Sequence, residues 1–156
     1  MNLEARSRTR LPGAMAGANP ALVRRGSFAV LVLLIIEFGI GMYVNLYDNV
    51  PKADHGGSIG TAISNGPATI SLHVVVGLLL GLGALGVVVA SIMARHLVAI
   101  ILSAIGLLAM ILAMVAGTSF TSSPGASESM AMSVFTGVAA LCYAGNVYFL
   151  RAGRSG

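Results

Sequence analysis

Charged residues are scarce in this chain, and their scarcity narrows what the protein can be. Asp, Glu, Lys and Arg make up 9% of its 156 residues, whereas a soluble domain carries about a quarter. Apolar residues make up 56%, and the mean hydropathy is +0.91. Such a chain cannot cover its surface with water-facing groups. We therefore exclude a cytosolic enzyme, a secreted domain and a disordered protein.

Cysteine, tryptophan and the usual catalytic patterns are also rare or missing. The single cysteine excludes an internal disulfide and any metal site built from several cysteines. There is no tryptophan. The sequence contains no Gly-rich phosphate loop, no H-E-x-x-H motif and no paired carboxylates. These absences predict a protein that is not an enzyme and binds no metal.

Long apolar stretches dominate what is present. A helix that rises 1.5 Å per residue needs roughly 20 apolar residues to cross a bilayer core of about 30 Å. Four stretches qualify, at residues 28–46, 72–94, 97–116 and 130–150. Lipid offers no partner to a bare backbone, and the stretches lack the alternation of barrel strands. We therefore predict an all-α, up-down-up-down bundle of four transmembrane helices over residues 27–150.

The few cations are distributed unequally along the chain. Eight arginines precede the first stretch, lie in the turn between the second and third, or follow the fourth, whereas Lys52 alone lies in another loop. The positive-inside rule therefore places both termini in the cytoplasm. Together with the abundance of Arg, Ala, Gly and Val, this predicts a protein of the bacterial cytoplasmic membrane. No aromatic-interleaved basic surface accompanies the cations, so nucleic acid is not an expected partner.

The two ends of the chain differ from its apolar middle. Residues 1–26 are basic and have few large apolar side chains, so we expect a disordered cytoplasmic segment. The first apolar stretch has 19 residues, longer than the core of a signal peptide, and is expected to be retained. Residues 151–156 form the expected cytoplasmic tail.

Glu37 is the only charged residue within the first apolar stretch. Counting from residue 28 places it at a depth of about 14 Å, in a layer where no Lys, Arg or His is expected. We therefore expect a protonated carboxyl that faces the bundle interior and is bonded to Tyr143, with Asn146 as a further intramembrane candidate. Two interpretations stay open: a proton- or cation-binding site, or a structural contact to a helix or partner subunit.

His73 is expected at the outer interface, in a small polar cluster with Asn45, Tyr47 and Asp48. An imidazole can ligate haem iron, but Ser133 occupies the corresponding position of the fourth helix. No cofactor is therefore predicted, with haem b on His73 as the alternative.

Glycines provide a third pattern. Gly77 and Gly81 lie one turn apart on one face of the second helix, and Gly137 lies on the fourth. In lipid such small faces let helices approach closely. They predict tight packing within the bundle or a homo-oligomer.

Four short segments carry a resemblance. These are EFGIGMYVNLY from Glu37, GP at 66–67 with LH at 72–73, GTSF from Gly117 and SMAM from Ser129. Together the segments resemble small four-helix bacterial membrane proteins of uncharacterised activity. A more distant likeness is to one half of haem A synthase and to b-type cytochrome bundles, whose second and fourth helices each offer a histidine. Here only His73 matches.

Three functional hypotheses follow. The first is an accessory or structural subunit, or an assembly factor, that docks in the bilayer to itself or to a larger complex. The second is a haem-binding redox bundle that uses His73. The third is a proton- or solute-conducting oligomer with Glu37 in its pathway.

Overall fold

The computed structural model describes residues 19–47, 59–122 and 125–152. Four long helices account for most of them: α1 (Pro20–Tyr47), α3 (Ala68–Met93), α4 (Leu97–Ser122) and α5 (Ala126–Ala152). A short helix, α2 (Ile59–Asn65), precedes α3. Each long helix contains a span long and apolar enough to cross a membrane. The prediction of an all-α bundle with four membrane spans is confirmed.

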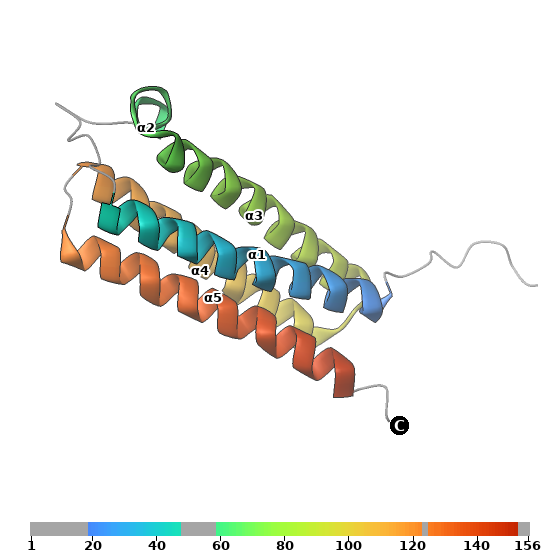
Figure 1. Cartoon of the computed structure of the whole chain (residues 1–156). Coiled ribbons are helices and arrows are strands. Elements are labelled where there is room, and N and C mark those ends of the chain that lie inside the picture. The colour runs from blue at the N-terminus through green and yellow to red at the C-terminus, as the bar shows by residue number, and fades with distance from the viewer. Residues whose placement is uncertain (1–18, 48–58, 123–124, 153–156) are drawn as a thin grey trace, which may run out of the picture.

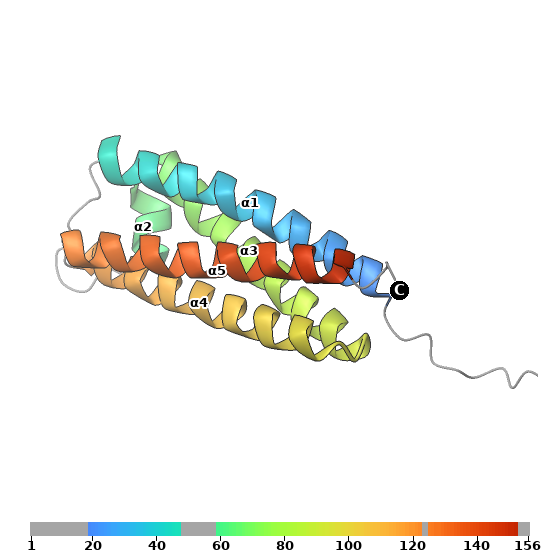
Figure 2. The ribbon, with the colours of Figure 1, turned by 90° about the horizontal axis from the view of Figure 1, so that it is seen from below.

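The four long helices form a closed ring in which consecutive elements run in opposite directions (Figures 1 and 2). α1 packs against α3 and α5, and α4 packs against the same two helices. The start of α1, the turn between α3 and α4 and the end of α5 lie together, at what we call the terminal end (Figure 1). The short helix lies at the opposite end, which we call the α2 end.

The helices are longer than the apolar stretches suggested, and the largest difference is in α1. This helix begins at Pro20 rather than at residue 28, because proline suits the first helical position and the side chain before it caps the helix. The backbone N–H of Ala21 donates to Oδ1 of Asn19 over 2.9 Å. Residues 20–26 therefore belong to α1 and not to a disordered segment. The rest of that segment, residues 1–18, and the tail at 153–156 lie outside the described residues.

Most of the remaining boundaries also move outward, although α3 ends at Met93, one residue earlier than predicted. α4 begins at Leu97 as predicted but continues to Ser122, and α5 begins at Ala126, four residues early. The sequence did not predict α2, which is tied to α3 by the Ser71 hydroxyl donating to the carbonyl of Ile63 over 2.9 Å.

A three-residue turn joins α3 to α4 at the terminal end. The N–H of Arg95 donates to the Ile92 carbonyl over 3.0 Å, and the N–H of His96 donates to the Ser91 carbonyl over 3.4 Å. This is the Schellman arrangement, in which the residue after the helix cap is left-handed and usually glycine. Here Arg95 has a φ of 53°, so a side chain occupies a conformation that favours glycine.

Close approaches at glycines fix the register between α1 and α3. A Cβ placed on Gly26 would lie 3.1 Å from Val87, and one placed on Gly83 would lie 3.7 Å from Val30. Farther along, Gly77 lies beside the side chain of Glu37. Residues later in α1 therefore contact residues earlier in α3, as antiparallel helices require.

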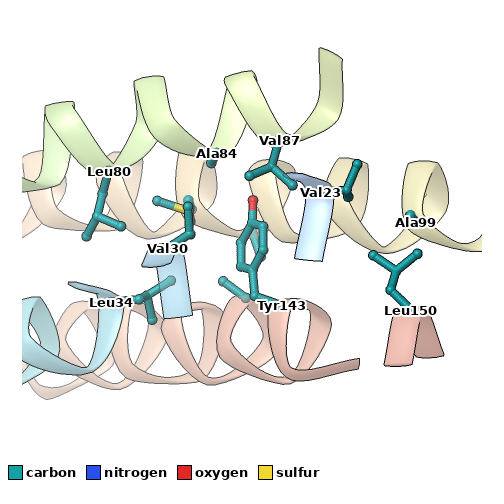
Figure 3. Packing of buried hydrophobic residues seen from close by; sticks show 12 residues of the cluster. Val23, Val30, Leu34, Leu80, Ala84, Val87, Ala99, Tyr143 and Leu150 are labelled. Carbon is teal, nitrogen blue, oxygen red and sulfur yellow. The ribbon is translucent and has the colours of Figure 1, made fainter. Parts of the chain in front are cut away.

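Most of the buried apolar residues form one cluster to which all four long helices contribute (Figure 3). Tyr143 reaches from α5 across the bundle toward Ala84 and Val87 of α3 (Figure 3). Large apolar side chains such as Leu82 and Leu141 lie on the outside, where a lipid-facing surface needs them.

Candidate functional site

Glu37 and His73 meet between α1 and α3. Oε1 of Glu37 lies 2.7 Å from Nδ1 of His73. Glu37 is 9% exposed, and the side chain of His73 is 33% exposed. This pair contradicts the expectation that no histidine shares the layer of Glu37.

The predicted depth of Glu37 was wrong because α1 begins earlier than predicted. Counted from Pro20, Glu37 is 17 residues along α1, which is about 26 Å rather than 14 Å from the terminal end. That distance places Glu37 opposite Gly77 of α3, one turn from His73. The two polar side chains are therefore within reach of each other, in the half of the bundle nearer α2.

Two glycines make room for the pair in a reciprocal way. A Cβ on Gly41, four residues after Glu37, would lie 2.9 Å from Cε1 of His73. A Cβ on Gly77, four residues after His73, would lie 3.4 Å from Oε1 of Glu37. The side chain of Glu37 thus lies over Gly77, and the side chain of His73 lies over Gly41. The E-x-x-x-G and H-x-x-x-G spacings were visible in the sequence, and they are the signal that could have identified the pair.

The contact between Oε1 and Nδ1 requires a proton. Two lone pairs facing each other at 2.7 Å would repel, so one of the two atoms must carry a hydrogen that the other accepts. Within the described residues Oε1, Nδ1 and the buried Oε2 of Glu37 make no well-aligned hydrogen bond. The pair therefore holds a proton and still presents an unsatisfied oxygen.

A cavity of about 220 Å³ lies beside the pair, between α1, α3, α4 and α5. Glu37 and His73 form part of its wall. Most of the remaining lining is apolar, including four methionines, Met42, Met110, Met114 and Met132, and two phenylalanines, Phe38 and Phe120. Further polar groups in the wall are Asn45, Thr118, Ser129, Ser133 and Thr136. All of these residues belong to the half of each helix nearer the α2 end.

Tyr143 and Asn146 lie elsewhere. The ring of Tyr143 packs on Gly106 of α4, since a Cβ there would lie 2.9 Å from Cε2 of the tyrosine. This register places both residues in the terminal half, with Ser27, Ser91 and Ser103, which like them are fully buried. The Tyr143 hydroxyl has no hydrogen-bond partner among the described residues. The expected bond from Glu37 to Tyr143 is therefore wrong.

The outer polar cluster does not form as expected. Asn45 lines the cavity, but Tyr47 is 72% exposed and stacks on Tyr43 with ring centroids 5.1 Å apart. Asp48 lies outside the described residues.

The glycines selected from the sequence also differ from one another. Gly77 packs against Glu37, whereas a Cβ on Gly81 or Gly137 would meet no atom within 4 Å in the described part of the chain. Closer contacts are made at glycines that were not selected, among them Gly41 and Gly106, where a Cβ would lie 2.9 Å from the nearest atom.

Metal and cofactor ligands are sparse in the described segments. No group of three or more His, Cys, Asp or Glu side chains gathers there. Among the described residues, His73 is the only imidazole in the cavity wall. About 150 Å³ suffices for a benzene ring, so the cavity has room for one ring with small substituents.

The chain was also compared with known proteins. No protein-family model, curated protein or solved structure matches it.

Proposed function

We propose that the protein is a multi-pass membrane protein that binds a small amphiphilic molecule between its helices, with Glu37 and His73 as the polar anchor. The observation that carries this proposal is the position of the pair. It lies in the wall of an otherwise largely apolar cavity, and Oε2 of Glu37 is buried there without a hydrogen-bond partner. A bound molecule with one polar group and an apolar body would complement both features.

The energetics favour binding over a purely structural role for the pair. A buried ionisable pair is often no more stabilising than well-packed apolar residues of the same volume, and ionisable groups within a bilayer are costly. An apolar pair at positions 37 and 73 would hold α1 and α3 together equally well. The carboxyl and imidazole are therefore better explained by a ligand than by stability.

The cations support an orientation for the site. Arg24, Arg25 and Arg95 all belong to the terminal end of the bundle. By the positive-inside rule, this end faces the cytoplasm of a bacterial cell and the cavity lies in the outer half of the membrane.

A second candidate is the accessory subunit or assembly factor. Gly81 and Gly137 have open space beside them, as a seat for another helix would require. This role predicts a partner in the membrane and no small-molecule binding. Conduction by an oligomer requires a polar path that continues past Glu37, whereas the next layer toward the terminal end contains Leu34, Leu80 and Met110.

The proposal is tested by measuring whether small probes bind to the native chain and whether a larger side chain in the cavity prevents their binding. The probes are benzyl alcohol, benzylammonium and benzoate, titrated into the full chain in detergent while the unfolding temperature is measured. At least one probe should bind saturably and raise the unfolding temperature, because a ligand at a hundred times its Kd stabilises a protein by about 2.7 kcal/mol. Ala113→Phe, which fills the cavity from α4, should abolish this effect.

Ala104→Phe is the matched control, because Ala104 lies on the same helix but on its exposed face. This variant should bind the probes like the native chain. If no probe binds saturably, or if both variants lose binding equally, the proposal is wrong. A stable complex with another membrane protein would then support the accessory role.

A further inference from the structure

We propose that the molecule bound in the cavity is a small organic cation, and that its binding releases the proton held by Glu37 and His73. This inference rests on the proposed function and adds the charge of the ligand and the exchange that accompanies binding.

The charges around the cavity point to a cation. Its wall contains one carboxyl and, in the described part of the chain, neither lysine nor arginine. The described arginines Arg24, Arg25 and Arg95 lie toward the opposite end of the bundle. An anion would therefore find no lysine or arginine in the described part of the wall, whereas a cation would find the unsatisfied Oε2 of Glu37.

The apolar part of the wall is also suited to a cation. The rings of Phe38 and Phe120 carry electron-rich faces that attract an organic ammonium group. The four methionines add polarizable thioethers on flexible side chains, which adapt to ligands of different shape. A neutral hydrocarbon would use the same apolar contacts but would leave the carboxyl unused.

Few titratable groups face the pair. α1 contributes Glu37 and α3 contributes His73, and the described parts of α4 and α5 add no Asp, Glu, His, Lys, Arg, Cys or Tyr to the cavity wall. Glu128, in the first turn of α5, is not in the wall; its Oε2 accepts from the Ser127 hydroxyl over 2.8 Å. Cys142 and Tyr143 lie in the terminal half. Proton exchange in the cavity is therefore assigned to the pair alone.

The proton balance follows from net charge. With a neutral imidazole and an ionised carboxyl, the pair has a charge of −1, which is costly in a site without a countercharge. The empty site therefore holds one further proton and is neutral. A monovalent cation can take the place of this proton and keep the site neutral. The cation then binds to the anionic pair, and one proton is released into solution. No bond other than that to this proton breaks.

Two isosteric probes separate charge from shape. Benzyltrimethylammonium carries a quaternary nitrogen, and neopentylbenzene has a carbon in its place. Binding of each to the purified full chain is measured by calorimetry between pH 5 and pH 8, in buffers of different ionisation enthalpy. The Kd of the cation should fall tenfold for each unit rise in pH while the empty site is protonated, with one proton released per cation. The Kd of the neutral probe should not change with pH.

Glu37→Gln keeps the shape of the side chain and removes the charge. It should abolish the pH dependence and weaken the cation at least tenfold at pH 8, while neopentylbenzene still binds and shows that the cavity is intact. Glu128→Gln is the matched control and should leave both probes unchanged. If Glu37→Gln binds neither probe, Ala113→Phe and Ala104→Phe still test whether the probes bind in the cavity, because neither variant changes its charge.

The outcomes distinguish this inference from the proposed function. If the neutral probe binds as tightly as the cation at every pH, or the cation binds without proton release, the exchange is wrong and the binding function stands. If neither probe binds the native chain and the benzyl panel also fails, both are wrong.

Discussion

The two halves of the bundle use the same helices in different ways. The fully buried side chains belong to the terminal half or to its border, and they are Val23, Ser27, Ala84, Ser91, Ser103, Ala139, Tyr143 and Asn146. The cavity and the Glu37–His73 pair belong to the α2 half. Small residues that let helices approach dominate the first region, and flexible methionines surround the second. The comparison suggests that one half holds the bundle together so that the other can keep a cavity.

Buried polar side chains occur in both halves of the bundle but differ in kind. In the terminal half they are uncharged, and some are bonded to the backbone: the Ser91 hydroxyl donates to the Val87 carbonyl over 2.7 Å, and Ser103 donates to the carbonyl of Ala99. In the α2 half they are ionisable and face a cavity. Backbone-bonded hydroxyls can stay within a closely packed helix pair, whereas the free carboxyl oxygen of Glu37 faces a cavity in which we propose a ligand.

The largest effect is expected where the terminal half is tightest. Gly106→Ala would place a Cβ 2.9 Å from Cε2 of Tyr143 and 3.3 Å from Cβ of Cys142. Neither α4 nor α5 can yield easily, so we expect the free energy of unfolding to fall by about 1–3 kcal/mol. Reversible unfolding in SDS-containing mixed micelles measures it.

Gly86→Ala is the control for this substitution, because a Cβ on Gly86 would meet no atom within 4 Å in the described residues. It should leave stability unchanged or slightly higher. Equal effects at positions 86 and 106 would mean that the terminal half is not the tightly packed region.

The pair in the α2 half should couple strongly but add little net stability. His73→Leu leaves Glu37 without its partner, and we expect a loss of about 1–2 kcal/mol. Glu37→Leu combined with His73→Leu should recover most of this loss, because two apolar side chains need no partner. A double-mutant cycle in the same unfolding assay measures the coupling. A double variant less stable than either single variant would give the pair a structural role.

The sequence predicted the fold well and the site only in part, for identifiable reasons. Four long apolar runs allow little besides four helices in lipid, so the bundle followed directly. The start of α1 did not, because Pro20 and Arg24 lie outside the apolar run that marked the helix. Because of that difference, the predicted depth of Glu37 was wrong by about two turns. The prediction therefore named Tyr143 as its partner, whereas the structure has His73 there. Register depends on the fit of glycines such as Gly106 and Gly41 to particular side chains, and hydropathy does not contain this information.

A smaller effect tests whether the polar groups of the terminal half are needed. Both amide atoms of Asn146 are buried without a hydrogen-bond partner in the described part of the chain. Asn146→Leu removes two unsatisfied polar atoms at similar volume, so we expect the free energy of unfolding to rise by about 1 kcal/mol. A loss of stability instead would show that Asn146 bonds to a buried water or to a partner, and the contrast between the two halves would weaken.

The smallest effect concerns the turn that closes the terminal end. Arg95 adopts a φ of 53°, which glycine reaches without a steric penalty. We expect Arg95→Gly to raise the free energy of unfolding by about 0.5–1 kcal/mol relative to Arg95→Ala, in the same mixed-micelle assay. Both variants remove the same charge, so their difference isolates the backbone. If the two are equally stable, the turn stores no strain, and the terminal half owes its stability to helix packing alone.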